Sequence, residues 1–133
     1  LSQIYRFGLT EAVDISGGYY KNVLFAREVI NYIEDHISDR ITTRGIADAI
    51  SYSEAYFCRL FRKVFNRSFI DYLNDCRINK SISLIESGVE NISEISNSVG
   101  IGNCSYFAKL FRGRTGCLPS EYIIEFKYKI GKL

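Results

Sequence analysis

A seven-residue segment occurs twice in this chain, fifty positions apart, and this internal repeat constrains the fold more than any other feature. Tyr56–Arg62 reads YFCRLFR, and Tyr106–Arg112 reads YFAKLFR. The similarity extends to both sides of the segment, where the paired stretches are Asp71-Tyr72 with Glu121-Tyr122 and, one residue out of step, Ile46–Ile50 with Ile95–Val99. Two copies of one supersecondary unit are therefore present, and the second copy has one extra residue between its parts.

Each copy has the apolar spacing of two short helices joined by a tight turn. In the first copy the longer helix carries apolar residues at i, i+3, i+4, i+7 and i+8, namely Phe57, Leu60, Phe61, Val64 and Phe65. The turn spans residues 51–53 in the first copy and 100–103 in the second, and each turn ends in a Ser or Asn that can cap the next helix. This is the helix-turn-helix pattern, whose second helix enters the major groove of DNA.

The pattern predicts an all-α fold of about seven helices, in which two helix-turn-helix subdomains are joined by a long linker helix. Residues 1–22 contain three glycines and no clear period, so we interpret them as a linker or the remnant of another domain. The first subdomain is expected at residues 23–67, with a covering helix from Val23 to His36. The linker helix is expected at residues 68–88, and the second subdomain at residues 89–133, where Pro119 begins the last helix.

Phe69–Glu86 is interpreted as one continuous helix because it contains no Pro or Gly and aligns Ile78, Ser81, Ile82 and Ile85 on one face. At about 1.5 Å per residue, such a helix spans roughly 27 Å. Successive major-groove faces on one side of B-DNA lie about 34 Å apart. A rod of this length is compatible with two reading helices in adjacent groove segments.

The net charge of +2 is small for a protein that binds nucleic acid, but the charges are unevenly distributed. Residues 1–53 carry five basic and seven acidic side chains, whereas residues 104–133 carry six basic and two acidic ones. Between these regions, four cations without an intervening acid crowd into nine positions: Arg59, Arg62, Lys63 and Arg67. Two basic clusters in a balanced chain indicate two local contacts with a polyanion.

The sequence offers no motif for a metal, a cofactor or a catalytic group. Cys58, Cys76, Cys104 and Cys117 form no C-x-x-C pair, so we expect reduced thiols with structural or surface positions. His36 has no ligand-spaced partner. No apolar stretch approaches the roughly 20 residues of a membrane span, and no secretory signal is visible. We therefore expect a cytoplasmic protein without membrane contact.

The residues resemble the DNA-binding domain of the AraC/XylS family of bacterial regulators over about residues 25 to 125. The matching pieces are IADAISYSEAYFCRLFRK, the linker pattern YLNDCRINKS, and ISEISNSVGI followed by YFAKLFR and TGCLPSEY. The departures are mild. Asn66 replaces a usual Gly but tolerates a left-handed backbone, Ser81 and Ser96 replace Ala, and Ile101 stands where an aromatic residue is common.

The resemblance implies sequence-specific binding of double-stranded DNA by a transcription regulator at the nucleoid, with RNA polymerase as a further partner. The absence of an initiator Met and the featureless first 22 residues suggest a piece of a longer regulator, whose effector or dimerisation domain is missing here. Operator, effector and direction of regulation stay open.

The resemblance also assigns the DNA contacts. Base-facing positions are Ala55, Cys58 and Arg59 in the first reading helix and Cys104, Ser105, Ala108 and Lys109 in the second. Arg59 is the strongest reader, since a guanidinium can pair with O6 and N7 of guanine. We interpret the remaining contacts as phosphate contacts: Thr43, Arg44, Arg62, Lys63 and Arg112. The aromatic residues Phe57, Tyr106, Phe107 and Phe111 are expected in the core.

Two other function classes remain open at this stage. A DNA-repair enzyme with a reactive Cys is one, although no Cys here has an adjacent His or a basic partner at a helix start. A helical protein-interaction module that has lost DNA binding is the other. The salt dependence of DNA binding separates these classes from a DNA-binding regulator.

Overall fold

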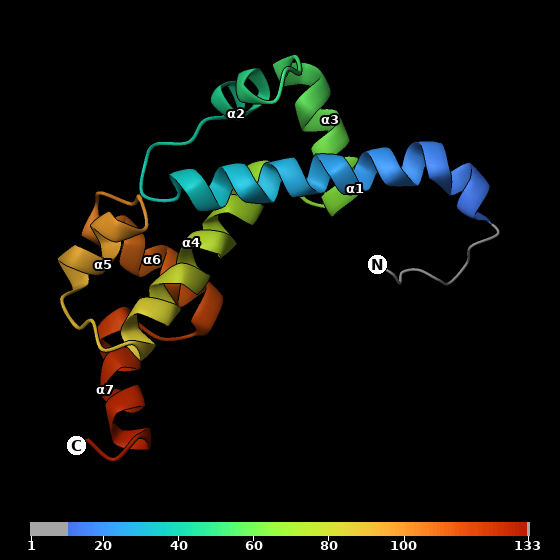
Figure 1. Ribbon diagram of the computed structural model, residues 1–133. Coiled ribbons are helices and arrows are strands. Elements are labelled where there is room, and N and C mark those ends of the chain that lie inside the picture. The colour runs from blue at the N-terminus through green and yellow to red at the C-terminus, as the bar shows by residue number, and fades with distance from the viewer. Residues whose placement is uncertain (1–10, 133) are drawn as a thin grey trace.

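The computed structural model describes residues 11–132, and this part of the chain contains seven helices and no strand (Figure 1). In chain order the helices are α1 (Glu11–His36), α2 (Thr43–Ala49), α3 (Glu54–Phe65), α4 (Phe69–Glu86), α5 (Ile92–Ser98), α6 (Cys104–Thr115) and α7 (Pro119–Lys129). The predicted all-α class with about seven helices is confirmed. The stretch Phe69–Glu86, interpreted as one continuous helix, is α4, which lies within the segment 68–88 expected for the linker helix.

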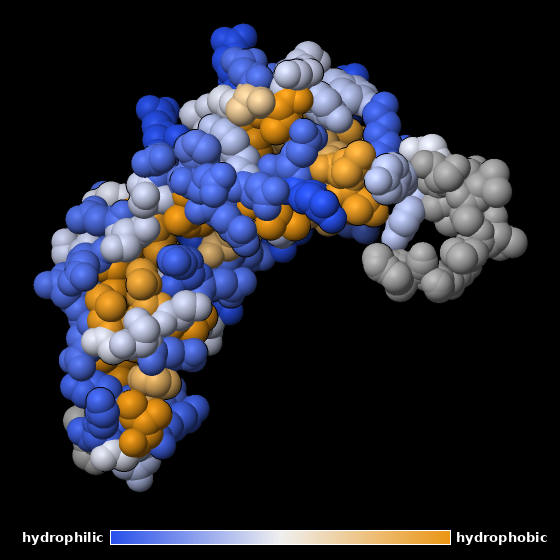
Figure 2. All heavy atoms as spheres, in the orientation of Figure 1, coloured by the Kyte–Doolittle hydropathy of each residue, from blue (hydrophilic) through white to orange (hydrophobic). Residues whose placement is uncertain are grey.

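The seven helices surround two separate hydrophobic cores. The first core lies among α1, α2, α3 and the start of α4, and its largest members are Phe25, Phe57, Phe61 and Phe69. The second core lies among the rest of α4 and α5 to α7, and it includes Ile78, Ile85, Ile95, Phe107 and Phe111. On the face shown in Figure 2, hydrophobic residues reach the surface in several patches along the length of the molecule. Because α4 contributes side chains to both cores, it is a shared wall as well as a connection.

The sequence repeat reappears in the backbone. Ser53 Oγ accepts a hydrogen bond from the Tyr56 amide at the start of α3, and Asn103 Oδ1 accepts one from the Tyr106 amide at the start of α6. Both helices end at a residue in the left-handed conformation, Asn66 with φ 59° and Gly116 with φ 90°. Asn66 thus retains the helix end that the family usually builds with Gly.

Helix α1 begins earlier than predicted, at Glu11 in place of Val23. Residues 17–21 are all exposed, so this part of the helix has no buried face and no apolar period in its sequence. These residues extend the helix toward the N-terminus from the part where Phe25, Val29 and Ile33 pack in the first core. Residues 11–22 of the segment interpreted as a linker or the remnant of another domain therefore belong to helix α1. Residues 1–10 of the same predicted segment lie outside the described residues.

Candidate nucleic-acid interface

Helix α3 separates a buried face from a basic face. Its buried side chains are Phe57, Leu60 and Phe61. The predicted contacts all lie exposed on the remaining surface: Ala55, Cys58, Arg59, Arg62 and Lys63. The last four of these residues line one shallow surface depression. The structure thus brings the predicted contacts of the first unit together on one side of the helix.

Arg59 is oriented by a neighbouring aromatic ring. Its guanidinium carbon lies 5.8 Å from the centroid of the Tyr56 ring, within the range of a cation–π contact. Tyr56 is itself exposed, at 39%. Within the described part of the chain, no carboxylate lies within ion-pair distance of Arg59. The charge is therefore available to an external anion or to the acceptors of a base edge.

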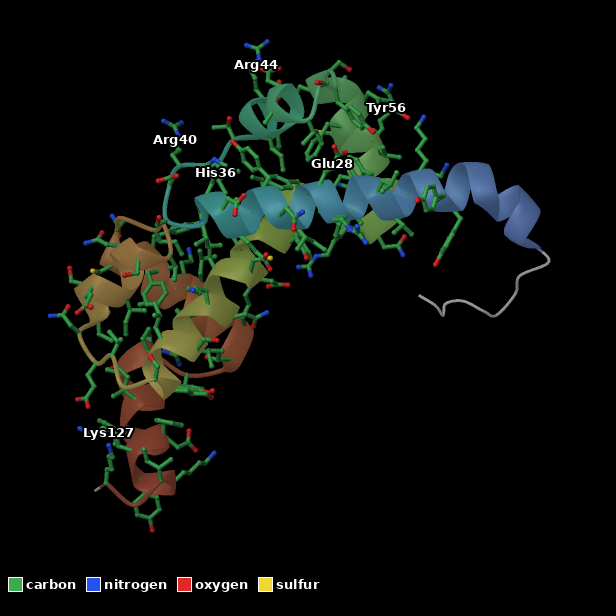
Figure 3. The ribbon with its side chains drawn as sticks, viewed as in Figure 1. Glu28, His36, Arg40, Arg44, Tyr56 and Lys127 are labelled. Atoms are coloured by element: carbon green, nitrogen blue, oxygen red, sulfur yellow. The ribbon has the colours of Figure 1, made fainter. Side chains whose placement is uncertain are left out.

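Glu54 links the starts of α2 and α3 and was not singled out from the sequence. Thr43 Oγ1 donates a 2.5 Å hydrogen bond to Glu54 Oε2, and Arg44 Nε lies 4.0 Å from Glu54 Oε1. Thr43 is half-buried, whereas Arg44 is exposed and projects from α2 away from the molecule (Figure 3). An acid in a first helical turn is an ordinary helix preference, so the sequence contained no signal for this role. The Glu54 carboxylate therefore lies close to the polar groups of both predicted contacts of α2.

Helix α6 repeats the arrangement of α3 with smaller side chains. Phe107 and Phe111 are fully buried. The predicted contacts Cys104, Ser105, Lys109 and Arg112 are exposed, and Ala108 is half-buried. The core positions predicted for Phe57, Phe107 and Phe111 are confirmed.

The core position predicted for Tyr106 was wrong, because this side chain is 50% exposed. Tyr106 directly precedes Phe107, and neighbours on a helix point about 100° apart. It therefore lies beside the buried stripe rather than on it. Tyr56 occupies the same position in the first unit and is exposed as well.

Some cations of α3, α6 and the turn after α3 pair with an acid, and the others do not. Arg67 and Arg114 both form ion pairs with Asp75 on α4. Burial on its own raises the pKa of Asp75, but hydrogen bonds from Arg114 and Arg67 outweigh this effect and hold the pKa below its ordinary value. Among the described residues, the other cations of α3 and α6 have no acidic partner: Arg59, Arg62, Lys63, Lys109 and Arg112.

The cysteines and the histidine have structural surroundings. All four cysteines are free, with Cys58 and Cys104 exposed, and burial raises the pKa of the half-buried Cys76 thiol. His36 Nδ1 lies 2.9 Å from the Tyr32 carbonyl oxygen, near the end of α1 (Figure 3). Residues 11–132 contain no group of three or more His, Cys, Asp and Glu side chains that could hold a metal ion. No helix in the same range is long and apolar enough to cross a bilayer.

Comparison with known sequences identifies a family and several relatives. The profile of a helix-turn-helix domain family matches residues 46–123. The uncharacterized HTH-type transcriptional regulator YdeC of Bacillus subtilis is 32% identical over 72% of this chain and 33% of its own length. The DNA-binding dual transcriptional regulator Rns of Escherichia coli is 33% identical over 77% of this chain and 38% of its own length. The chain thus spans about a third to two fifths of the curated relatives it matches.

Comparison with solved structures gives the same fold. A transcriptional regulator from Chromobacterium violaceum with an AraC-type DNA-binding domain superposes with a TM-score of 0.71 at 20% identity, over 83% of this chain and 96% of that one. The DNA-binding domain of AdpA, solved in complex with a target DNA, superposes with a TM-score of 0.73 at 19% identity, over 77% of this chain and 93% of that one. Both superpositions cover more than three quarters of this chain, so both chains share its helical fold over that part.

Proposed function

The chain belongs to the AraC-type helix-turn-helix family of transcription regulators, and on this premise we propose that it binds one asymmetric DNA duplex through α3 and α6 in adjacent major-groove segments. The observation that carries the proposal is the pair of equivalent helices, each with an exposed cationic face free of acidic partners among the described residues. Both are packed against α4. Because the repeat runs in one direction within one chain, the half-sites are direct and about one turn apart.

The side chains divide into base readers and phosphate contacts. Arg59 reads a guanine, and Ala55 and Cys58 offer small apolar contacts, for example to a thymine methyl group. In the second helix the corresponding base-facing residues are Cys104, Ser105, Ala108 and Lys109. Phosphates are held by Arg62, Lys63 and Arg112, and by Thr43 and Arg44 at the start of α2 once Glu54 has released them.

We also propose that the whole protein is longer than this chain, since the relatives are more than twice as long. A further domain that senses an effector or dimerises then modulates the binding of these two units. The bound protein contacts RNA polymerase, acts at the nucleoid in the cytoplasm and catalyses no reaction. This assignment follows the relatives, which are transcription regulators.

A salt titration tests the proposal. The probe is a fluorescent duplex selected by the chain itself from random DNA. Four cations assigned to phosphates, Arg44, Arg62, Lys63 and Arg112, predict a log–log slope of about −3.6, or about a hundredfold weaker binding between about 50 mM and about 200 mM salt. Lys129→Ala is the control, because Lys129 lies on α7 and pairs with Glu125; it should leave the slope unchanged. A slope near zero for the parent chain would contradict DNA binding.

Footprinting of the same duplex tests the two-unit arrangement. Two protected segments about one helical turn apart are expected on one face of the DNA. Protection of a single half-turn by the intact chain would show that only one unit reads the duplex.

A further inference from the structure

Two residues on the linker helix, Asp75 and Arg77, each contact both helix-turn-helix units. They lie two positions apart near the middle of α4. Two residues correspond to about 200° of helix rotation, so the two side chains leave opposite faces of α4. The contacts on each face come from elements far apart in the sequence.

Asp75 joins the units through two arginines. Arg67, in the turn that follows α3, lies 2.5 Å from Asp75 Oδ2 through its Nη2. Arg114, in the last turn of α6, donates from Nε to Asp75 Oδ1. One carboxylate therefore ties the end of the first reading helix to the end of the second. Each arginine comes from a different basic cluster, so this pairing also withdraws one cation of each cluster from the surface available to DNA.

Arg77 joins the units from the opposite face. Its side chain is 8% exposed, and Nη2 donates to the carbonyl oxygens of Asp39 at 2.7 Å and Ile37 at 3.4 Å, both just after α1. Gly100, in the turn of the second unit, covers the same guanidinium. A Cβ atom at Gly100 would lie 2.5 Å from the Ile37 carbonyl oxygen and 2.8 Å from Arg77 Nη2. The turn of the second unit thus packs directly on the end of α1.

We propose that Asp75 and Arg77 form a two-sided brace that fixes the separation and rotation of α3 relative to α6, and thereby sets the half-site spacing that the chain accepts. The proposal rests on the DNA-binding function proposed above. Hydrophobic packing on α4 does not by itself tie one unit to the other, because the two cores are separate and share no side chain. One base pair shifts a half-site by about 3.4 Å and rotates it by about 35°, so even a modest roll changes which spacing fits.

The first test measures the geometry without DNA. Cys58 on α3 and Cys104 on α6 are both exposed and can carry spin labels once Cys76 and Cys117 are replaced by alanine. Pulsed electron spin resonance then gives the distribution of distances between the two reading helices. We expect a narrow distribution in the parent and one about twofold broader in Asp75→Ala. Glu90→Ala, which breaks an ion pair with Lys127 inside the second unit, is the control with the same charge change. Equal widths in all three proteins would overturn the brace.

The second test measures spacing preference. The selected duplex is prepared with one base pair inserted or removed between the half-sites, and binding is measured for the parent, Asp75→Ala and Glu90→Ala. The parent and Glu90→Ala should each bind the altered duplexes about tenfold more weakly than the selected duplex. Asp75→Ala should lose no more than about threefold in affinity in the same comparison. An identical spacing profile in all three proteins overturns the brace but leaves DNA binding intact. Failure of the parent to select any duplex instead contradicts the proposed function, and the spin-label distances still decide whether the brace exists.

Arg77→Lys gives an independent check from the opposite face of α4. Lysine keeps the charge but replaces the planar guanidinium, which Gly100 covers, with a compact ammonium group. Thermal unfolding monitored by circular dichroism establishes that each variant is folded before its distances are compared. If Arg77→Lys is folded and has the parent's distance distribution, Arg77 does not contribute to the brace.

Discussion

The turns of the two helix-turn-helix units both begin with a residue in the left-handed conformation but face different surroundings. Ser51 in the first turn and Gly100 in the second both adopt a left-handed conformation, with φ 66° and φ 80°. Ser51 is exposed, whereas Gly100 lies against Arg77 and the end of α1. The first turn therefore needs only a residue that tolerates positive φ, and the second also needs the absence of a side chain. The two units thus share a fold, and the contact between the units explains why the second turn has glycine where the first has serine.

The reading helices differ in a related way. Positions fifty residues apart carry Arg59 and Lys109, Arg62 and Arg112, and Lys63 and Gly113. Arg59 can form a bidentate contact with guanine, whereas Lys109 offers a point charge. In the proposed function the first unit thus has the stronger means of base recognition, and the second resembles it chiefly in Arg112, which is proposed to contact a phosphate. The contrast between the turns and the contrast between the reading helices yield four predictions, ordered by the size of the expected effect.

Gly100→Ala is expected to have the largest effect, a loss of about 3 kcal/mol in the free energy of unfolding, because overpacking and left-handed strain act together. Gly116→Ala isolates the strain, since Gly116 has φ 90° but nothing within 4 Å of its Cβ position. That variant should lose about 1 kcal/mol. Urea unfolding of both variants measures the difference. Equal losses would mean that Gly100 is required only for its backbone conformation.

The brace shows what the sequence could and could not predict. The approximate number of helices, the caps Ser53 and Asn103 and the buried Phe57 and Phe107 follow from local spacing, which the repeat makes easy to read, whereas the first residues of α1 carry no such spacing. Asp75 contacts Arg114 across 39 positions, and no periodicity within a helix reports such a contact. Sequence spacing likewise places Arg59 on an exposed face, but its orientation over Tyr56 requires the folded helix.

Arg59→Ala should weaken binding to the best operator by roughly 1 to 3 kcal/mol and relax the preference at one base pair. Lys109→Ala, at the equivalent position, should cost about 1 kcal/mol or less and leave the preference unchanged, because a single ammonium group discriminates bases weakly. Competition binding with single-base variants of the operator measures both effects. If Arg59→Ala weakened operator and random DNA equally, base reading would have to be reassigned to α6 or to DNA shape.

Arg62→Ala and Arg112→Ala test where the two units are alike. Both arginines are exposed at equivalent positions, and neither has an acidic partner within the described residues. Each substitution should reduce the salt slope by about one unit and weaken operator and random duplexes alike. Anisotropy titrations at several salt concentrations provide the slopes. A change of base preference in either variant would show that this arginine reads sequence.

Ser51→Gly should have the smallest effect and the opposite sign. A serine at φ 66° carries left-handed strain of roughly 1 to 2 kcal/mol, and glycine relieves it. Glycine also costs roughly 0.5 to 1 kcal/mol through the greater freedom of the unfolded chain, so the net gain in unfolding free energy lies between about 0 and about 1.5 kcal/mol. The exposed position leaves no packing term to oppose this gain. Urea unfolding at matched protein concentration measures it, and the spin-label distance between α3 and α6 should not change. A stability loss in Ser51→Gly would mean that the serine side chain stabilises the first turn, and the two turns would then differ in more than their surroundings.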